Sequence, residues 1–464
     1  MNHRYSRPLD VNGKVVNMSH IRRPAARRPG AQPFPFIIST RLPTLPAGLR
    51  PAGVAVLAAS LAFLAACGGG SDGTGGSAPT ASAPTAQADI LGPVARATGA
   101  PVKIGVITDG ASAVADHTND NKVAEATAKY LNEHESGMGG RPIEITVCET
   151  LGDLSKATDC GNQLVEKGVS AVLIGVSGVV ESAWKPLSDA RIPVMLYGSS
   201  DPGLLTSPTT FSLGNPTFPV IDLPIQVAKD QGNKKVASIV IDVPAALHSA
   251  QDVAPPLFEK AGIGYELVRV APGTADMTPQ MQQIADDGSD QVFIIGNDSF
   301  CISAMNGLKA VGFTGTITAI SQCITDATRK AVPASTLKGV VVSATVPIGP
   351  DSPSMRLYTK VAETYGDGID LSAQDGMIMF SLVASFQVAT QGISGDITPA
   401  AITSTIKAMK ETALPAGAGL KFRCNGKAIP DQPAVCVLGG LTTALDDKGQ
   451  PTQYKVLGNT PIAD

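Results

Sequence analysis

Aromatic rings and the side chains of common catalytic motifs are scarce in this chain. Phe, Trp and Tyr make up 4% of the residues, there is one Trp, and only five of the 464 residues are His. Neither His-Glu-x-x-His nor Gly-x-x-x-x-Gly-Lys-[Ser/Thr] occurs. Gly-x-Ser-x-Gly matches only at residues 69–73, in a glycine-rich stretch without the strand and helix that a nucleophile elbow needs. We therefore expect no enzyme, although distant residues could still assemble a hydrolase triad.

Metal-binding motifs and later membrane-length apolar runs are missing too. No Cys-x-x-Cys occurs, and the only histidines after residue 67 are His117, His134 and His248. Structural zinc sites use closely spaced Cys and His, so we expect neither a metal nor a cofactor. No apolar run after residue 67 reaches the roughly 18 residues that a membrane span requires.

The N-terminal region has the pattern of an export signal. Nine Lys or Arg lie in the first 50 residues, and Val54–Cys67 is a run of fourteen residues without charge. It ends in Leu-Ala-Ala-Cys, which resembles the lipobox of bacterial lipoproteins. We predict an N-terminal extension and signal peptide over residues 1–66 and lipidation at Cys67, which tethers the protein to a membrane. The region exceeds the roughly 15–30 residues of a signal peptide, so translation starts further along or 1–45 is an extension.

The part of the chain that follows the predicted signal peptide, residues 67–464, is acidic. Of the 36 Lys/Arg and 40 Asp/Glu, nine bases and one acid lie in residues 1–66, which leaves 27 bases, 39 acids and a formal charge of −12. Nucleic-acid binding needs a basic face, so we expect no such partner. Residues 67–100 begin with the cysteine and continue as a stretch rich in Gly, Ser, Ala, Pro and Thr, which predicts a flexible linker.

The six remaining cysteines form three local couples. An even number of cysteines in an exported chain favours disulfides, and buried free thiols are the alternative. Several connectivities are possible, and we predict the three local ones: Cys148–Cys160, Cys301–Cys323 and Cys424–Cys436.

Short β-rich runs alternate with helical patterns from residue 103 onwards. One series has strands near 103–108, 143–148, 171–174 and 193–196, and a second has them near 236–241, 265–270, 291–295, 316–320 and 339–342. Strands separated by helices pair in parallel, which predicts an α/β fold of two doubly wound lobes. The C-terminal part has β-like stretches at 420–423, 435–438 and 453–457. We assign residues 101–219 and 346–415 to lobe one, and 220–345 and 416–464 to lobe two.

Four stretches in this order resemble the type I periplasmic binding proteins, specifically the branched-chain amino-acid group of ABC-transporter substrate-binding proteins. They are Lys103–Gly110 followed by Gly139–Glu144, Ala171–Gly178, Arg191–Pro202 and Lys234–Asp242. The resemblance implies two lobes joined by crossover strands that close on a small ligand, as in a Venus flytrap. It further implies a monomeric receptor outside the cytoplasmic membrane whose partner is an ABC permease; a sensor not coupled to import is the alternative.

Candidate ligand-binding residues lie where strands end, because ligands of open parallel sheets bind beyond the carboxyl ends of the strands. Helix N-termini there suit a carboxylate, and Ser hydroxyls can donate or accept. Alternatively, Ser177 and Asp298 cap helices, and the Ser199–Ser200 stretch is an ordinary loop. The candidates are Asp109, Ser112, Ser177, Gly178, Val179, Ser199, Ser200, Asp242, Asn297, Asp298, Phe300 and Gln322.

Two departures from the family pattern concern the ligand. Amino-acid binders often have a Glu near the position of Gln322 that pairs the ligand's ammonium group, and an amide cannot carry that charge. Asp242 is followed by Val-Pro-Ala, where the family often has an aromatic residue and Gly. The ligand class therefore stays open between an amino acid, an amide and a small carboxylate.

Overall fold

The protein was analysed as a computed structural model that describes residues 90–112, 116–347 and 352–464. The predicted signal peptide, the lipidation site at Cys67 and the linker up to residue 89 lie outside the described residues. Residues 90–100, whose composition predicts linker, are mostly exposed but are attached to the folded protein at several points. Leu91 is 7% exposed, and the N–H groups of Ala95 and Ala97 donate to the carbonyls of Glu133 and Asn132.

The first sheet has five parallel strands in the order β2-β1-β3-β4-β5. Apolar β-branched runs fit such strands because both faces of the sheet are covered. The strands are β1 Val102–Thr108, β2 Ile143–Glu149, β3 Ala171–Ile174, β4 Val194–Leu196 and β5 Thr210–Ser212.

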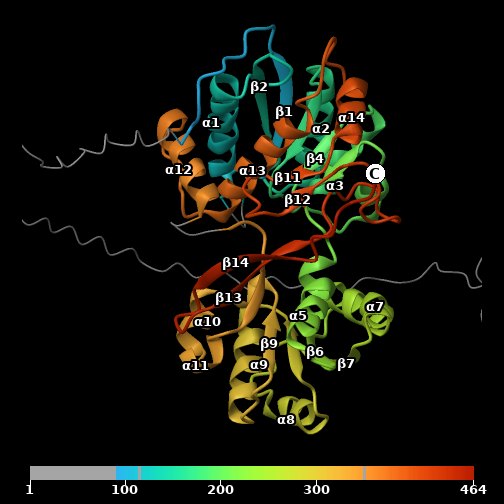
Figure 1. The fold of residues 1–464 in the computed structure, drawn as a ribbon, viewed down its shortest axis with the longest axis vertical. Coiled ribbons are helices and arrows are strands. Elements are labelled where there is room, and N and C mark those ends of the chain that lie inside the picture. Colours follow the sequence, from blue (N-terminus) through green and yellow to red (C-terminus); the bar gives the residue numbers. More distant parts are fainter. Residues whose placement is uncertain (1–89, 113–115, 348–351) are drawn as a thin grey trace, which may run out of the picture. The chain divides into compact units, whose positions relative to one another are not determined.

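Helices cover both faces of this sheet (Figure 1). On one face α2 (Leu154–Glu166) and α3 (Val180–Asp189) pack against Ile107, Val172 and Ile174. On the other, α1 (Thr118–His134) packs beside α12 (Pro353–Tyr365) and α13 (Gln374–Ala389). Almost every residue of α13 is buried, which explains why it lacks a polar face. The first sheet is therefore covered by helices from two distant parts of the chain.

The second sheet has seven strands in the order β14-β13-β10-β9-β8-β6-β7. The pairs from β7 to β10 are parallel, whereas β13 and β14 add an antiparallel hairpin at one edge. The strands are β6 Lys235–Ile241, β7 Gly264–Val270, β8 Gln291–Ile295, β9 Thr316–Ala319, β10 Val341–Ala344, β13 Gly440–Leu445 and β14 Pro451–Leu457.

Two helical layers cover the second sheet as well (Figure 1). The helices on one face are α5 (Leu223–Gln231) and α7 (Ala254–Ala261), and those on the other are α8 (Thr278–Asp286), α9 (Asp298–Ala310) and α11 (Ala334–Leu337). Short elements complete the chain: α4 Pro202–Thr206, η1 Phe218–Asp222, α6 Pro244–Leu247, η2 His248–Val253, η3 Ser321–Cys323, α10 Asp326–Ala331, α14 Pro399–Ala408, β11 Thr412–Ala413 and β12 Lys421–Phe422.

The predicted α/β class with two parallel-rich sheets is confirmed. The predicted strand at residues 435–438 is wrong in its position along the chain. These residues form only a single bridge, between Val435 and Ser212. The N–H of Ala434 donates to Leu205, that of Cys436 donates to Ser212, and the carbonyl of Cys436 accepts from Arg423, so no ladder develops. The strand forms instead at β13 (Gly440–Leu445).

The three cysteine couples are joined as disulfides, Cys148–Cys160, Cys301–Cys323 and Cys424–Cys436. Residues 414–437, part of which the sequence assigns to lobe two, contribute Leu420, Phe422 and Val437 to the core of the first sheet. Within the described ranges, no helix combines the length and apolar character that crossing a bilayer requires.

Candidate functional site

A pocket of ≈ 350 Å³ lies where the chain passes between the two sheets. Three connections contribute to it: the stretch after β5, the end of β10, and the residues before β13. The ends of β4 and β9 complete the wall. Its lining comprises residues 197–200, 213–216, 218–220, 320–322, 343–345, 420 and 439–441.

Three of the sequence-predicted residues line this pocket: Ser199, Ser200 and Gln322. Ser199 Oγ accepts from the N–H of Asp201 at 3.0 Å, so its hydroxyl proton stays available. Ser200 is exposed, and Gln322 is exposed with its Oε1 accepting from Ser321 Oγ at 3.3 Å. The Gln322 NH₂ group can therefore donate to a ligand. The Cys301–Cys323 disulfide fixes the backbone directly after Gln322 to helix α9.

Asn215 is a pocket residue that the sequence did not single out. It is 8% exposed, and its Nδ2 donates to the carbonyl of Leu438 at 2.7 Å and to Asp222 Oδ2 at 3.1 Å. Its Oδ1 accepts from the N–H and hydroxyl of Thr217 at 3.0 and 2.8 Å. Burial raises the pKa of Asp222, although its hydrogen bonds from Thr217 and Asn215 oppose the shift. Asn215 thus ties two of the chain connections together at the pocket wall.

Tyr197 also links two separate stretches of chain at the pocket wall. Its hydroxyl donates to the carbonyl of Thr345, which lies just beyond β10. Burial raises the pKa of Tyr197, so the phenol remains a neutral donor. A lone Tyr after a strand carries no sequence signal for this contact, because the acceptor is a backbone group far along the chain.

Asp109, Ser177 and Gly178 come together at the carboxyl edge of the first sheet, but they bind each other. The Asp109 carboxylate, 5% exposed, accepts from Thr150 Oγ1 and Ser177 Oγ at 2.6 Å each and from the N–H of Gly178 at 2.9 Å. Ser177 Oγ also accepts from the N–H of Val179 at 3.1 Å. Since the Ser177 proton is used on Asp109, this hydroxyl can accept from a ligand but cannot donate to one.

The remaining candidates lie outside the pocket lining. Asp242 pairs with Arg269 Nη2 at 2.9 and 3.1 Å. Asn297 caps α9 by accepting from the N–H of Phe300 at 3.0 Å, and Asp298 accepts from the N–H of Ser299. Phe300 is 3% exposed and packs in the core of the second sheet, so its ring does not face the pocket. Ser112 lies after β1 and is half-buried. Whether any of these residues binds ligand stays a prediction.

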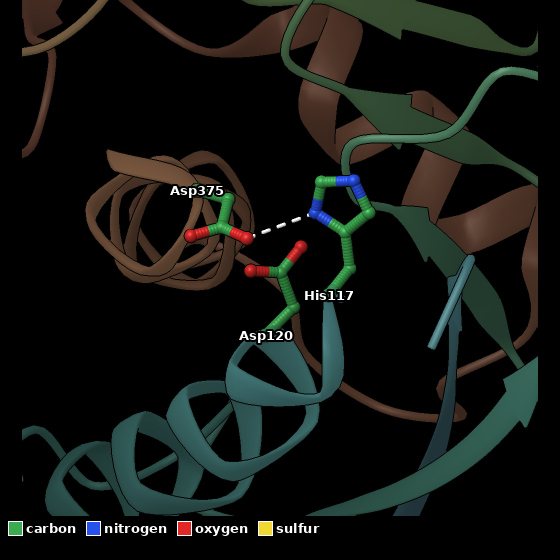
Figure 2. A group of neighbouring side chains, drawn as sticks. All are labelled: His117, Asp120 and Asp375. Atoms are coloured by element: carbon green, nitrogen blue, oxygen red, sulfur yellow. Dashed lines mark hydrogen bonds and ion pairs between the residues drawn. The ribbon is translucent and has the colours of Figure 1, made fainter. Parts of the chain in front are cut away.

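A second polar cluster lies at the carboxyl edge of the first sheet. His117, Asp120 and Asp375 come from the N-terminal ends of α1 and α13, and their side chains point toward one another (Figure 2). His117 Nδ1 and Asp375 Oδ2 are 2.8 Å apart. Burial, with the neighbouring Asp375 carboxylate, raises the pKa of Asp120 to about 8, against an opposing effect of the Val176 N–H. Sequence spacing did not predict this cluster, because Asp375 lies 258 residues beyond His117 along the chain.

Comparison with known proteins connects this fold to one family. The family model described as periplasmic binding protein matches residues 101–437. The Leu/Ile/Val-binding protein homolog 6 of Brucella suis biovar 1 (strain 1330) is 25% identical over 268 residues, which cover 53% of this chain and 67% of that protein.

Two solved structures share the fold. One, of a putative branched-chain amino acid ABC transporter from Rhodospirillum rubrum, has a TM-score of 0.64 at 17% identity and covers 77% of this chain and 100% of that chain. The other, a solute-binding protein of an ABC transporter from R. palustris in complex with 4-hydroxybenzoate, has a TM-score of 0.54 at 18% identity and covers 78% and 96%. The family is one of binding proteins and not of enzymes. With most of its length matched and both sheets in place, the chain belongs to the periplasmic binding protein family.

Proposed function

We propose that this protein is the lipid-anchored solute receptor of an ABC importer and that it binds a small carboxylate without an ammonium group in the pocket at the chain connections. The observation that carries the proposal is the chemistry of the pocket wall. Among the described residues that line it, none is charged, while Ser199, Ser200 and Gln322 offer hydrogen bonds. A carboxylate can accept from the hydroxyl and amide donors of this wall, whereas the ammonium group of an amino acid would be buried there without an acidic partner, which is costly.

The size of the pocket fits this ligand class. Its volume of ≈ 350 Å³ is at the small end of the roughly 300–1,000 Å³ typical of small-molecule sites. The wall is largely apolar, with Leu213, Phe218 and Ile320 beside the hydroxyl and amide groups. The ligand's carboxylate binds the hydroxyls of Ser199 and Ser200, and the Gln322 amide binds a polar group at its other end. Binding shifts the protein toward the state in which both sheets contact the ligand.

Calorimetry with a matched panel tests this assignment. The panel contains 4-hydroxybenzoate, benzoate, benzamide, leucine and isoleucine. We expect heat from the carboxylates without ammonium, and a roughly 10-fold or greater loss of affinity in Ser200→Ala, because a hydrogen bond to a charged group is worth about 1.5–3 kcal/mol. The control is Ser404→Ala, an exposed serine on α14 away from this pocket. Tight binding of leucine with no response to the other carboxylates contradicts the ligand class.

The importer and the anchor require their own tests. Cys67→Ala releases the protein from membranes if a lipid on Cys67 holds it there. In cells, deletion of the gene abolishes uptake of the ligand found by calorimetry if the receptor serves an importer. Unchanged uptake together with an altered transcriptional response to the same ligand would favour the sensor function.

A further inference from the structure

The cluster of His117, Asp120 and Asp375 lies where two helices from distant parts of the chain begin. His117 precedes the first residue of α1, Asp120 is in its first turn, and Asp375 is in the first turn of α13. Because α1 and α13 pack side by side over the first sheet, the three side chains meet (Figure 1). Acidic residues in a first helical turn are common on their own, since they offset the helix dipole. Their burial is what needs another explanation.

Asp120 is the anomalous member. Its residue exposure is 0%, and neither carboxylate oxygen has a hydrogen-bond partner. The Val176 N–H acts on it electrostatically without meeting hydrogen-bond geometry. Its Oδ2 lies near Gly175, where a Cβ would come within 3.2 Å of it. A buried polar group without a partner is rare in folded proteins and costs free energy.

No basic side chain of the described residues forms an ion pair with either carboxylate, apart from the imidazole of His117 on Asp375. Lys122, the basic residue closest in sequence, donates instead to the carbonyl of Gly368 at 3.0 Å. Two carboxylates and one imidazole nitrogen therefore face one another without a Lys or Arg side chain paired to them. Figure 2 shows the Asp120 carboxylate pointing at the space between the other two side chains.

We propose that His117, Asp120 and Asp375 bind one divalent transition-metal ion of the zinc type. One ligand atom from each residue lies within 4.8 Å of the other two, so small side-chain rotations bring all three within bonding distance of a common ion. Zn–N and Zn–O bonds are about 2.0–2.2 Å long. An imidazole among the ligands favours zinc-type ions over Mg²⁺ and Ca²⁺, which prefer oxygen alone. The scarcity of His, from which we expected no metal, does not exclude a site with a single His.

The ion's role is to join two separate stretches of chain. α1 follows β1, whereas α13 returns to the first sheet after the whole parallel part of the second sheet. A metal bridging the start of both helices holds this packing and neutralises the buried Asp120. His117 and Asp375 side chains are 17% and 15% exposed, which leaves a path for the ion and for a water ligand.

The test uses the full chain, stripped with chelator and dialysed against Zn²⁺ and, separately, Co²⁺. We expect one tightly bound ion per chain, a rise in melting temperature on adding Zn²⁺, and a Co²⁺ absorption spectrum of nitrogen and oxygen ligands without thiolate bands, which separates this site from Cys67. Asp120→Asn keeps the shape of the side chain and removes the charge. It should weaken Zn²⁺ binding by more than about 100-fold, because even outer-shell substitutions at metal sites cost roughly 10–100-fold.

His248→Ala is the matched control. His248 and Asp252 form a surface pair with an Nδ1–Oδ2 distance of 3.0 Å, but no third carboxylate completes a site there among the described residues. This variant should bind Zn²⁺ like the parent, whereas His117→Ala should not. Zn²⁺ binding that is equal in Asp120→Asn and the parent overturns the proposal. So does a stripped parent whose melting temperature does not respond to Zn²⁺, since Asp120 would then be buried in its protonated form.

Discussion

The side chain of Asn215 donates to the backbone carbonyl of Leu438 and thereby links the first and last connections between the two sheets. The same amide group donates to Asp222, and its oxygen accepts twice from Thr217. A single buried side chain thus holds two crossing segments at the wall of the pocket.

Asn215→Ala should destabilise the protein. Loss of the amide removes the donor from the Leu438 carbonyl and leaves Asp222 with the Thr217 hydroxyl as its side-chain donor, and an unsatisfied buried group costs about 1–3 kcal/mol. Denaturant unfolding measures the change. The control is Asn425→Ala, whose Nδ2 donates to Ala463 at the surface and whose loss should cost no more than about 0.5 kcal/mol. Equal stability of the two variants would show that the Asn215 contacts contribute little.

Asp222 should make stability depend on pH. Its pKa is raised in the folded state above the value of 3.8 that applies when unfolded, so the folded protein holds the proton more tightly. The free energy of unfolding therefore falls as pH rises above about 3.8, until the folded pKa is passed. Asp222→Asn should lack this part of the pH dependence and be relatively more stable at neutral pH.

Unfolding titrations at several pH values test this expectation, with Asp230→Asn, an exposed carboxylate on α5, as the control. The charge of Lys229 lowers the pKa of Asp222 and so opposes the effect of burial. High salt screens this charge, so any effect of salt should be a larger pH dependence of stability. A pH profile of Asp222→Asn that overlays the parent would contradict the assignment.

Asp109→Asn tests whether this carboxylate serves the fold. Its Oδ2 accepts from the N–H of Gly178, and an amide NH₂ placed there would face another donor. We expect a loss of about 1.5–3 kcal/mol, the range for a hydrogen bond to a charged group. The comparison is Asp153→Ala, which removes the N-cap of α2 and should cost about 1 kcal/mol. Weaker ligand binding without any loss of stability would instead place Asp109 in the ligand site.

The Cys301–Cys323 disulfide should matter for binding as well as stability. Replacing both cysteines by Ser frees the chain beside Gln322, and we expect a stability loss of roughly 2–4 kcal/mol together with weaker binding of the ligand. Replacing Cys148 and Cys160 removes a disulfide between β2 and α2, away from the pocket, and should lower stability alone. Identical binding losses in the two double variants would argue against a local effect at Gln322.

The sequence predicted the long elements well, and the reasons are physical. Helix α2 (Leu154–Glu166) is one of the helical patterns between strands, because Asp153 caps its N-terminus and one of its faces is apolar. Strand β5, only three residues long, was not predicted because Thr210–Ser212 is too short to show a period. Residues 435–438 were predicted as a strand from their apolar composition, but they form only one bridge to the end of β5, at Ser212, and Cys436 bonds on its other side to Arg423.

The candidate site was predictable only in part. Ligands bind beyond the carboxyl ends of parallel strands, and this rule predicted Ser199 and Ser200 after β4 of the first sheet and Gln322 after β9 of the second. All three line the pocket where the chain passes between the two sheets. The bonds that occupy Asp109 and Ser177 depend on side-chain directions, which sequence spacing does not reveal. His117 and Asp375 are 258 residues apart, so no local pattern could bring them together.

The packing of α12 and α13 on the first sheet also governs the order in which the protein can be made. The first sheet's strands end at Ser212, but α12 and α13, which cover one of its faces beside α1, begin only at Pro353. During synthesis or export from the N-terminus, the part of that apolar face under α12 and α13 stays uncovered while on the order of 140 further residues emerge, a long loop to close. The parallel part of the second sheet, contiguous from β6 to β10, can fold meanwhile. A nascent chain halted before α12 is therefore a target for chaperones.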